Sequence, residues 1–172
     1  MVENRSEVAK QYYTWAEFDK DIGKIIRWAG GRNFKSVYGI PRGGLVVGVA
    51  ISHRLGLPLK LKMEELDRDT LIVDDIADSG RTLENLDKSL HLSMGYSTRG
   101  KGRSCGNPVA RSWGFQKRCG DKVLNFKPTA ATLFFNNKDS RRRPDFYIRE
   151  KKDWVVFLWE TERSSKYDNY NL

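Results

Sequence analysis

The sequence has few of the residues that build disulfide frameworks and structural metal sites. Its 172 residues include two cysteines, Cys105 and Cys119, and two histidines. Two thiols do not make a disulfide framework, and a zinc site needs about four ligands, most often Cys and His. We therefore expect neither a disulfide-stapled secreted domain nor a zinc protein.

Long apolar runs are also missing. No stretch approaches the roughly 20 apolar residues that a membrane-spanning helix requires. The first ten residues, MVENRSEVAK, are too polar for a signal peptide. The P-loop pattern G-x-x-x-x-G-K-[ST] of nucleotide-binding proteins does not occur either. These absences predict a cytoplasmic protein with no membrane partner, and they exclude P-loop chemistry.

Positive charge, by contrast, is in surplus. The chain has 31 Lys and Arg residues against 22 Asp and Glu residues, a formal net charge of +9. Such a balance favours a polyanionic partner, which is either a nucleic acid or a small substrate with several negative charges. The length fits one α/β domain with a substantial core, so we expect residues 1–172 to form a single domain.

The most informative stretch is TLIVDDIADSGRTL, residues 70–83. An apolar run typical of a buried parallel strand ends in Asp74 and Asp75, and a small-residue turn then leads into a helix that begins near Thr82. Open α/β folds bind ligands at the carboxyl ends of their strands, and the N–H groups of a helix N-terminus bind phosphate. Neighbouring carboxylates suit ribose hydroxyls or a hydrated Mg²⁺ ion. The pattern therefore predicts a site for a sugar phosphate and a metal ion.

Apolar periodicity and turn residues place the other elements. A capping box at Thr14 and Glu17 begins a helix that ends at Gly30, and a second helix is expected over residues 45–55. Further strands are expected at residues 36–40, 57–61, 130–135, 146–148 and 154–158. Strands that alternate with helices predict an α/β fold with a mainly parallel sheet flanked by helices.

The string DDIADSGRT, residues 74–82, resembles the ribose-phosphate-binding motif of type I phosphoribosyltransferases, enzymes that use phosphoribosyl pyrophosphate (PRPP). The resemblance implies their fold. It also implies a set of PRPP-binding residues: Asp74, Asp75, Ala77, Asp78, Ser79, Gly80, Arg81 and Thr82. Asp74 and Asp75 would bind the ribose hydroxyls and help to place Mg²⁺, and the turn that follows would hold the 5′-phosphate. Asp78 would be catalytic, as a proton acceptor or hydrogen-bond partner near N7 of a purine.

Residues 39–44, GIPRGG, resemble the pyrophosphate loop of the same family. Arg42 offers a planar and permanently charged group to phosphate oxygens. Gly43 lets backbone amides approach an anion closely. Arg42 and Gly43 are therefore the expected pyrophosphate-binding residues.

The ending KDWVVFLWE, residues 152–160, resembles the tryptophan-containing ending of xanthine–guanine phosphoribosyltransferases. The resemblance implies that Trp154 stacks on the purine, that Val155 contacts it through backbone groups, and that Glu160 binds a second Mg²⁺ ion. The family often has a lysine shortly after the strand expected at 130–135. Here Asn136 or Asn137 occupies that spot, and Lys138, one or two residues later, is the expected purine contact.

Residues 91–128 have no counterpart in the family pattern. Between Arg99 and Lys127, eight basic residues are opposed by Asp121 alone. The hood that shields the reaction from water in the family is cut to residues 60–69. We expect residues 91–128 to be a mobile basic insertion, which serves either as a substitute hood or as a surface for nucleic acid.

Three arginines precede Pro144, at positions 141, 142 and 143. We expect them to form a solvated turn. The alternative is a phosphate contact across a dimer interface.

Together the resemblances imply a Mg²⁺-dependent enzyme of purine salvage that works as a homo-oligomer, a dimer or tetramer. It would transfer the 5-phosphoribosyl group from PRPP to xanthine, guanine or hypoxanthine, giving a nucleoside monophosphate and pyrophosphate. One alternative is a regulator on the same fold, which senses PRPP or a nucleotide and binds nucleic acid through its basic insertion. The other is an enzyme for orotate, uracil or adenine, against which the ending at residues 152–160 argues.

Overall fold

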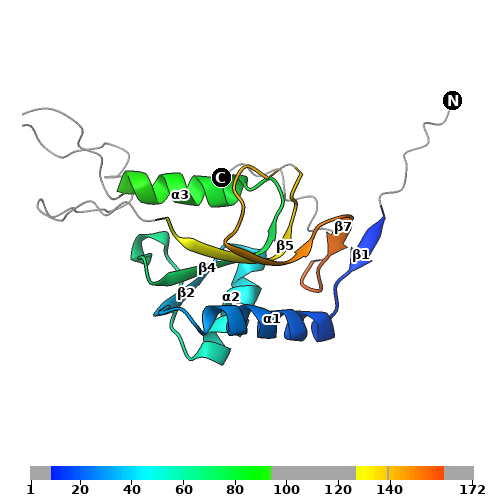
Figure 1. Ribbon diagram of the computed structural model, residues 1–172, viewed down its shortest axis with the longest axis horizontal. Coiled ribbons are helices and arrows are strands. Elements are labelled where there is room, and N and C mark those ends of the chain that lie inside the picture. Colours follow the sequence, from blue (N-terminus) through cyan, green and yellow to red (C-terminus); the bar gives the residue numbers. More distant parts are fainter. Residues whose placement is uncertain (1–8, 94–126, 139, 161–172) are drawn as a thin grey trace, which may run out of the picture.

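The computed structural model describes residues 9–93, 127–138 and 140–160 (Figure 1). The elements follow in the order β1 (Lys10–Tyr12), α1 (Trp15–Ala29), β2 (Ser36–Gly39), α2 (Gly43–Leu55), β3 (Leu59–Lys60), the 3₁₀ helix η1 (Met63–Glu65), β4 (Thr70–Ala77), α3 (Arg81–Ser93), β5 (Thr129–Phe135), β6 (Phe146–Glu150) and β7 (Trp154–Val156). The expected basic insertion falls almost entirely on residues 94–126, which lie outside the described ranges.

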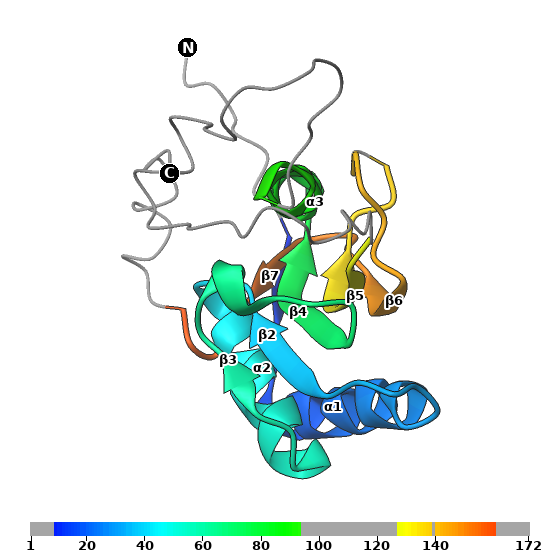
Figure 2. The same cartoon turned by 90° about the vertical axis from the view of Figure 1, so that its left-hand side faces the viewer.

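Five strands form one parallel sheet in the order β3-β2-β4-β5-β6. Helices α1 and α2 cover one face of this sheet, and α3 covers the other (Figures 1 and 2). A buried apolar cluster lies on each side: the one under α1 and α2 includes Ile22 and Val47, and the one under α3 includes Leu83 and Leu86. The prediction of an α/β fold with a parallel sheet flanked by helices is confirmed. None of the helices in the described part of the chain is long and apolar enough to cross a membrane.

The first helix begins as its sequence predicts. The Thr14 side chain accepts a hydrogen bond from the Glu17 backbone N–H at 3.2 Å, and the Glu17 carboxylate accepts one from the Thr14 N–H at 2.9 Å. This reciprocal capping box satisfies two of the N–H groups that a helix N-terminus leaves unpaired.

Strand β4 is longer than the sequence analysis predicts. It continues beyond Val73 to Ala77, and Asp74 pairs in register with Thr132 of β5. Asp74 and Asp75 therefore belong to a central strand and not to the turn that follows it. Strand β3, by contrast, is shorter than predicted, and it begins only at Leu59, after Pro58, which has no N–H group to give to the ladder.

A second, two-stranded sheet holds the end of the described chain. Strand β1, which the sequence analysis missed, pairs in parallel with β7, so that Lys10 lies opposite Trp154 and Tyr12 opposite Val156. The Trp154 N–H donates to the Ala9 carbonyl at 3.0 Å. The β1–β7 pair thus fixes the backbone of the segment that carries Trp154.

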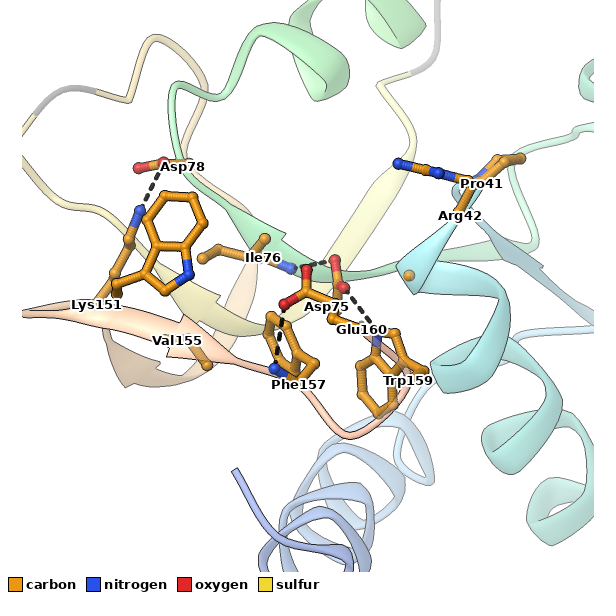
Figure 3. A pocket seen from close by; sticks show the side chains of 12 residues that line it. Pro41, Arg42, Asp75, Ile76, Asp78, Lys151, Val155, Phe157, Trp159 and Glu160 are labelled. Carbon is orange, nitrogen blue, oxygen red and sulfur yellow. Dashed lines mark hydrogen bonds and ion pairs between the residues drawn. The ribbon is translucent and has the colours of Figure 1, made fainter. Parts of the chain in front are cut away.

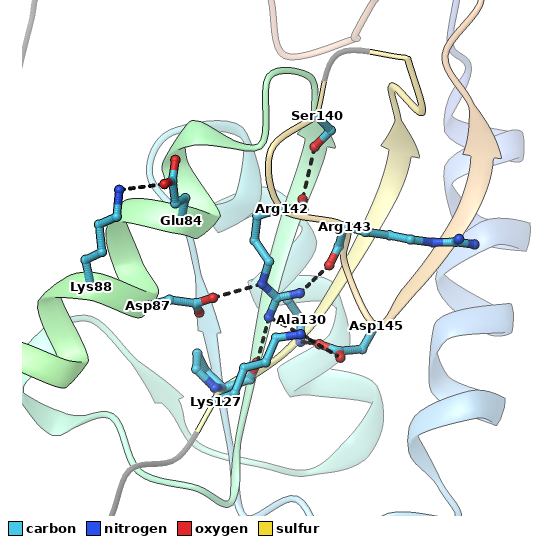
Figure 4. Close-up of polar contacts among 10 residues, drawn as sticks. Glu84, Asp87, Lys88, Lys127, Ala130, Ser140, Arg142, Arg143 and Asp145 are labelled. Carbon is cyan, nitrogen blue, oxygen red and sulfur yellow. Dashed lines mark hydrogen bonds and ion pairs between the residues drawn. The ribbon is translucent and has the colours of Figure 1, made fainter.

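The arginine turn is not fully solvated. Arg142 is 8 % exposed, and its Nε lies 2.9 Å from Asp87 Oδ2 on α3, while its Nη2 donates to the Pro128 carbonyl at 3.2 Å (Figure 4). Arg141 and Arg143 are exposed. The prediction of a solvated turn is therefore wrong for Arg142, which joins the β5–β6 connection to α3.

Candidate active site

A cavity of about 400 Å³ lies at the carboxyl end of the sheet (Figure 3). Its walls come from the turn after β2, the end of β4 and the chain from the end of β6 onward. The lining residues are Pro41, Arg42, Gly43, Asp75, Ile76, Asp78, Lys151, Trp154, Val155, Phe157, Trp159 and Glu160. A smaller cavity of about 100 Å³ shares Ile76 and Asp78 with it and extends along the turn before α3.

The turn between β2 and α2 forms one wall of the larger cavity. Arg42 precedes the first residue of α2, and the Pro41–Arg42 peptide bond is cis. A Cβ atom on Gly43 would overlap the Asp75 carboxylate. Glycine at this position therefore lets the N-terminus of α2 pack directly against β4. That helix end brings backbone N–H groups and a partial positive charge to the cavity, as an anion site requires.

The two predicted ribose-binding carboxylates face different cavities. Asp75 lines the larger cavity and Asp74 the smaller one, because successive side chains of a strand point to opposite faces. Asp75 Oδ2 accepts a hydrogen bond from the Trp159 indole N–H at 3.3 Å, and Asp74 Oδ1 accepts one from the Asp75 N–H at 3.0 Å. Both residues are 8 % exposed.

Burial decides the electrostatics of this pair. The pKa of Asp74 is raised well above its usual value. Burial is the larger cause, and the negative charge of the neighbouring Asp75 adds to it. Burial also raises the pKa of Asp75. A cation or hydroxyl donors next to either carboxylate would favour its charged form. The pair is therefore suited to a ligand that brings positive charge or hydroxyl groups.

The end of β4 and the turn before α3 line the smaller cavity with the predicted PRPP-binding residues Ala77, Ser79, Gly80 and Thr82. Gly80 has a φ of +65°, and a Cβ atom there would overlap Ser140 Oγ. The turn therefore needs glycine for its conformation and for its close packing. Arg81, the remaining predicted residue of this group, is exposed and lines neither cavity.

Asp78, the predicted catalytic residue, lines both cavities. Its Oδ2 lies 2.6 Å from Lys151 Nζ, and its Oδ1 accepts a hydrogen bond from Asn136 Nδ2 at 2.8 Å. Burial alone raises the pKa of Asp78, but the hydrogen bonds from Lys151 and Asn136 together outweigh it, so the pKa lies below its usual value. Asp78 is therefore a charged hydrogen-bond acceptor at neutral pH.

The expected purine contacts do not all reach the cavity. Trp154 is 46 % exposed and lines the cavity. Val155 lines the cavity as well (Figure 3). Lys138 is exposed on the turn after β5 and is not part of the lining. Lys151, which the sequence analysis missed, lines the cavity instead. The available signal was its position directly after β6, because the carboxyl ends of parallel strands share one edge of a sheet.

The acidic residues of the larger cavity fit a Mg²⁺ ion that is shared with a substrate. No group of three or more His, Cys, Asp or Glu side chains in the described ranges is arranged to hold a metal ion. Asp75 and Glu160 nevertheless line the same cavity. Mg²⁺ commonly binds through one or two carboxylates and completes its shell with substrate phosphates and water.

Compared by sequence, the chain matches no family model and no curated protein. Its fold, however, is similar to that of several solved structures. A purine phosphoribosyltransferase from Pyrococcus horikoshii superposes with a TM-score of 0.60 at 23 % identity, over 88 % of this chain and 94 % of that one. A xanthine–guanine–hypoxanthine phosphoribosyltransferase from Helicobacter pylori gives a TM-score of 0.61 at 17 % identity, over 92 % and 98 %.

A hypothetical protein from Neisseria gonorrhoeae with bound ppGpp gives a TM-score of 0.59 at 14 % identity, over 92 % of this chain and 93 % of that one. All three structures superpose on nearly the whole chain, although few residues are identical. The parallel sheet, the flanking helices and these superpositions agree: the chain has the type I phosphoribosyltransferase fold, with purine phosphoribosyltransferases among its structural neighbours.

Proposed function

We propose that the protein is a Mg²⁺-dependent phosphoribosyltransferase for 6-oxopurines, that is, for xanthine, guanine or hypoxanthine. The observation that supports this proposal is that one cavity joins Arg42 and Gly43, the Asp75 carboxylate, Asp78 and Trp154. An anion site, a carboxylate for a polyol or cation, a hydrogen-bond acceptor and an exposed aromatic face are the groups that PRPP and a purine need. A volume of about 400 Å³ falls in the usual range of small-molecule sites.

The phosphate groups of PRPP would bind at two helix ends. Pyrophosphate would lie against Arg42 and the N-terminus of α2, and the 5′-phosphate would occupy the smaller cavity before α3. The buried carboxylates of Asp74 and Asp75 would accept hydrogen bonds from the ribose hydroxyls. When bound, Mg²⁺ supplies charge neutralisation for the pyrophosphate, and Asp75 and Glu160 would hold it.

The reaction forms a bond between a purine nitrogen and the anomeric carbon while the bond from that carbon to pyrophosphate breaks. Trp154 would fix the plane of the base by stacking. Asp78 would accept a hydrogen bond from N7–H and stabilise the positive charge that develops on the purine as N9 attacks, and it would then accept the N7 proton, which the product nucleotide does not carry. Arg42 and the α2 amides would stabilise the charge that the leaving pyrophosphate gains.

The decisive experiment incubates the purified protein with PRPP, Mg²⁺ and each purine base in turn, with products identified by chromatography and mass spectrometry. We expect a nucleoside monophosphate from at least one 6-oxopurine and far less from adenine. An Asp75→Asn variant is the matched negative control, because it removes one carboxylate charge from the cavity and keeps the side-chain size. If no base gives a nucleotide although PRPP binds, the transferase proposal is wrong.

A second candidate function is a nucleotide-sensing regulator that binds nucleic acid. Helix α3 ends at Ser93 and β5 begins at Thr129, and both points lie at the edge of the sheet opposite the cavity (Figure 1). The basic residues between them are therefore attached far from the site, which favours a separate partner over a substitute hood. Because the structure of the Neisseria neighbour contains ppGpp, we would include ppGpp among the nucleotides tested for binding.

The two functions are separated by measuring binding without turnover. A regulator would bind PRPP or ppGpp, form no nucleotide, and bind RNA or DNA with an affinity that falls steeply with salt. Replacing residues 94–126 with a short Gly/Ser linker should remove that nucleic-acid binding. Full transferase activity in the same deletion variant would rule out a role of this segment as a hood.

A further inference from the structure

We propose that Lys151 makes the base subsite selective for 6-oxopurines over 6-aminopurines. This inference rests on the proposed function of the cavity as a purine site and names the residue that chooses between the two classes of base.

Lys151 is held firmly at the edge of the cavity. It follows β6 directly, and its backbone N–H donates to the Phe135 carbonyl of β5 at 2.8 Å. Its side chain is 16 % exposed, and its Nζ lies 2.6 Å from Asp78 Oδ2 and 5.7 Å from the centroid of the Trp154 ring. Figure 3 shows the Lys151 ammonium group beside the Asp78 carboxylate, and the cation–π distance places the exposed Trp154 indole next to the ammonium group.

Lys151 and Asp78 together offer a donor group and an acceptor group to the edge of a base that stacks on Trp154. A lysine ammonium group has three donors and no acceptor, whereas an ionised aspartate has acceptors only. A free 6-oxopurine with its proton on N7 presents the complementary pair, an O6 acceptor beside an N7–H donor. A 6-aminopurine presents an amino donor at position 6, which the ammonium group cannot pair. The arrangement therefore favours the oxo group.

Lys138, the residue expected from the sequence, is not in a position to do this. Asn136 is hydrogen-bonded to Asp78 through Nδ2 at 2.8 Å, while its Oδ1 accepts the Lys138 backbone N–H at 3.1 Å. The Lys138 side chain is exposed on that turn and does not line the cavity. Lys151 reaches the same carboxylate from the neighbouring strand end and is thus the cation that a bound base would meet.

The test compares the binding of the free bases hypoxanthine and adenine by isothermal titration calorimetry without PRPP, because these bases differ at position 6, can carry a proton on N7 and undergo no turnover. We expect the wild-type protein to prefer hypoxanthine. In Lys151→Met the affinity for hypoxanthine should fall ~10- to 100-fold, the usual effect of losing one charge-assisted hydrogen bond. The affinity for adenine should stay the same or rise, because Asp78 then favours a donor at position 6.

Two further variants control this test. Lys151→Arg keeps the charge and the donors and should retain a preference for hypoxanthine. Lys152→Met makes the same charge change one residue away, on an exposed side chain, and should leave both affinities unchanged. Circular dichroism verifies that each variant is folded.

Three results would overturn the inference: a wild-type protein without preference, equal losses of affinity for hypoxanthine and adenine in Lys151→Met, or loss of the preference in Lys138→Met in place of Lys151→Met. Equal losses would mean that Lys151 only positions Asp78. A Lys151-dependent preference for hypoxanthine in a protein that transfers no phosphoribosyl group would refute the proposed function and leave this inference standing.

Discussion

Replacing Arg142 with methionine should destabilise the protein strongly, although the residue lies in a turn of three arginines. Arg142 is 8 % exposed, pairs with Asp87 at 2.9 Å and with Asp145 at 3.5 Å, and also donates to the Pro128 carbonyl. Breaking one partner of a buried ion pair usually costs ~3–5 kcal/mol. Here the two carboxylates are 20 % and 36 % exposed, so water partly solvates them after the substitution. We therefore expect a loss of ~2–4 kcal/mol in the free energy of unfolding.

The neighbouring Arg141 provides a matched control. Its side chain is 61 % exposed and lies 3.9 Å from Glu84. Exposed pairs of this kind contribute ~0–1 kcal/mol, so Arg141→Met should be nearly neutral. In thermal unfolding followed by circular dichroism, Arg142→Met should lower Tm by roughly 5–15 °C and Arg141→Met by a few degrees at most. Equal, small shifts in the two variants would refute the reasoning that Arg142 joins the β5–β6 connection to α3.

Three further predictions concern the site and the first helix. Asp78→Asn should lower kcat by ~10²–10⁴-fold and change PRPP affinity little, and steady-state kinetics with an unchanged kcat would remove Asp78 from the chemistry. Trp154→Ala should cost ~1–3 kcal/mol of purine binding and spare PRPP binding, measured by calorimetry; equal losses would indicate a damaged fold. Hydrogen bonds from the Thr14 backbone and from Arg149 lower the pKa of Glu17 to about 2 from the ordinary 4.5. The charged Glu17 therefore stabilises the fold above about pH 4.5, and this contribution is lost as the pH falls towards 2. Because its side chain is 34 % exposed, urea unfolding of Glu17→Gln should show a pH dependence that is smaller by only ~1 kcal/mol over this window.

The strands and helices of the sheet could be predicted because each of these elements is marked by a pattern in its own segment of the sequence. The capping box at Thr14 and Glu17 sets where α1 begins, and the apolar run before Asp74 marks the central strand. The glycines at positions 43 and 80 mark the two turns that line the cavities. Each of these signals lies within a few residues of the structure that it predicts.

The features that the sequence analysis missed depend on residues far apart in the chain. The strand β1 has three residues and gains its pairing only from β7, more than 140 positions later. Lys151 is 73 positions from Asp78, and Arg142 is 55 positions from Asp87. In the sequence both cations belong to basic runs that are typical of a solvated surface. That Lys151 and Arg142 are shielded from solvent becomes evident only in the folded chain, where β6 brings Lys151 to Asp78 and the β5–β6 connection brings Arg142 to α3.

The same fold gives the acidic residues of the site opposite electrostatic environments. Asp74 and Asp75 are buried, and burial raises the pKa of both. Asp78, four residues after Asp74, is held charged by Lys151 and Asn136. Groups whose environments move their pKa values apart in this way usually have different tasks. Under the proposed function, the base subsite would therefore carry its own compensating cation, whereas the ribose–phosphate subsite would leave its carboxylates to be stabilised by the hydroxyl groups and the Mg²⁺ ion of the substrate.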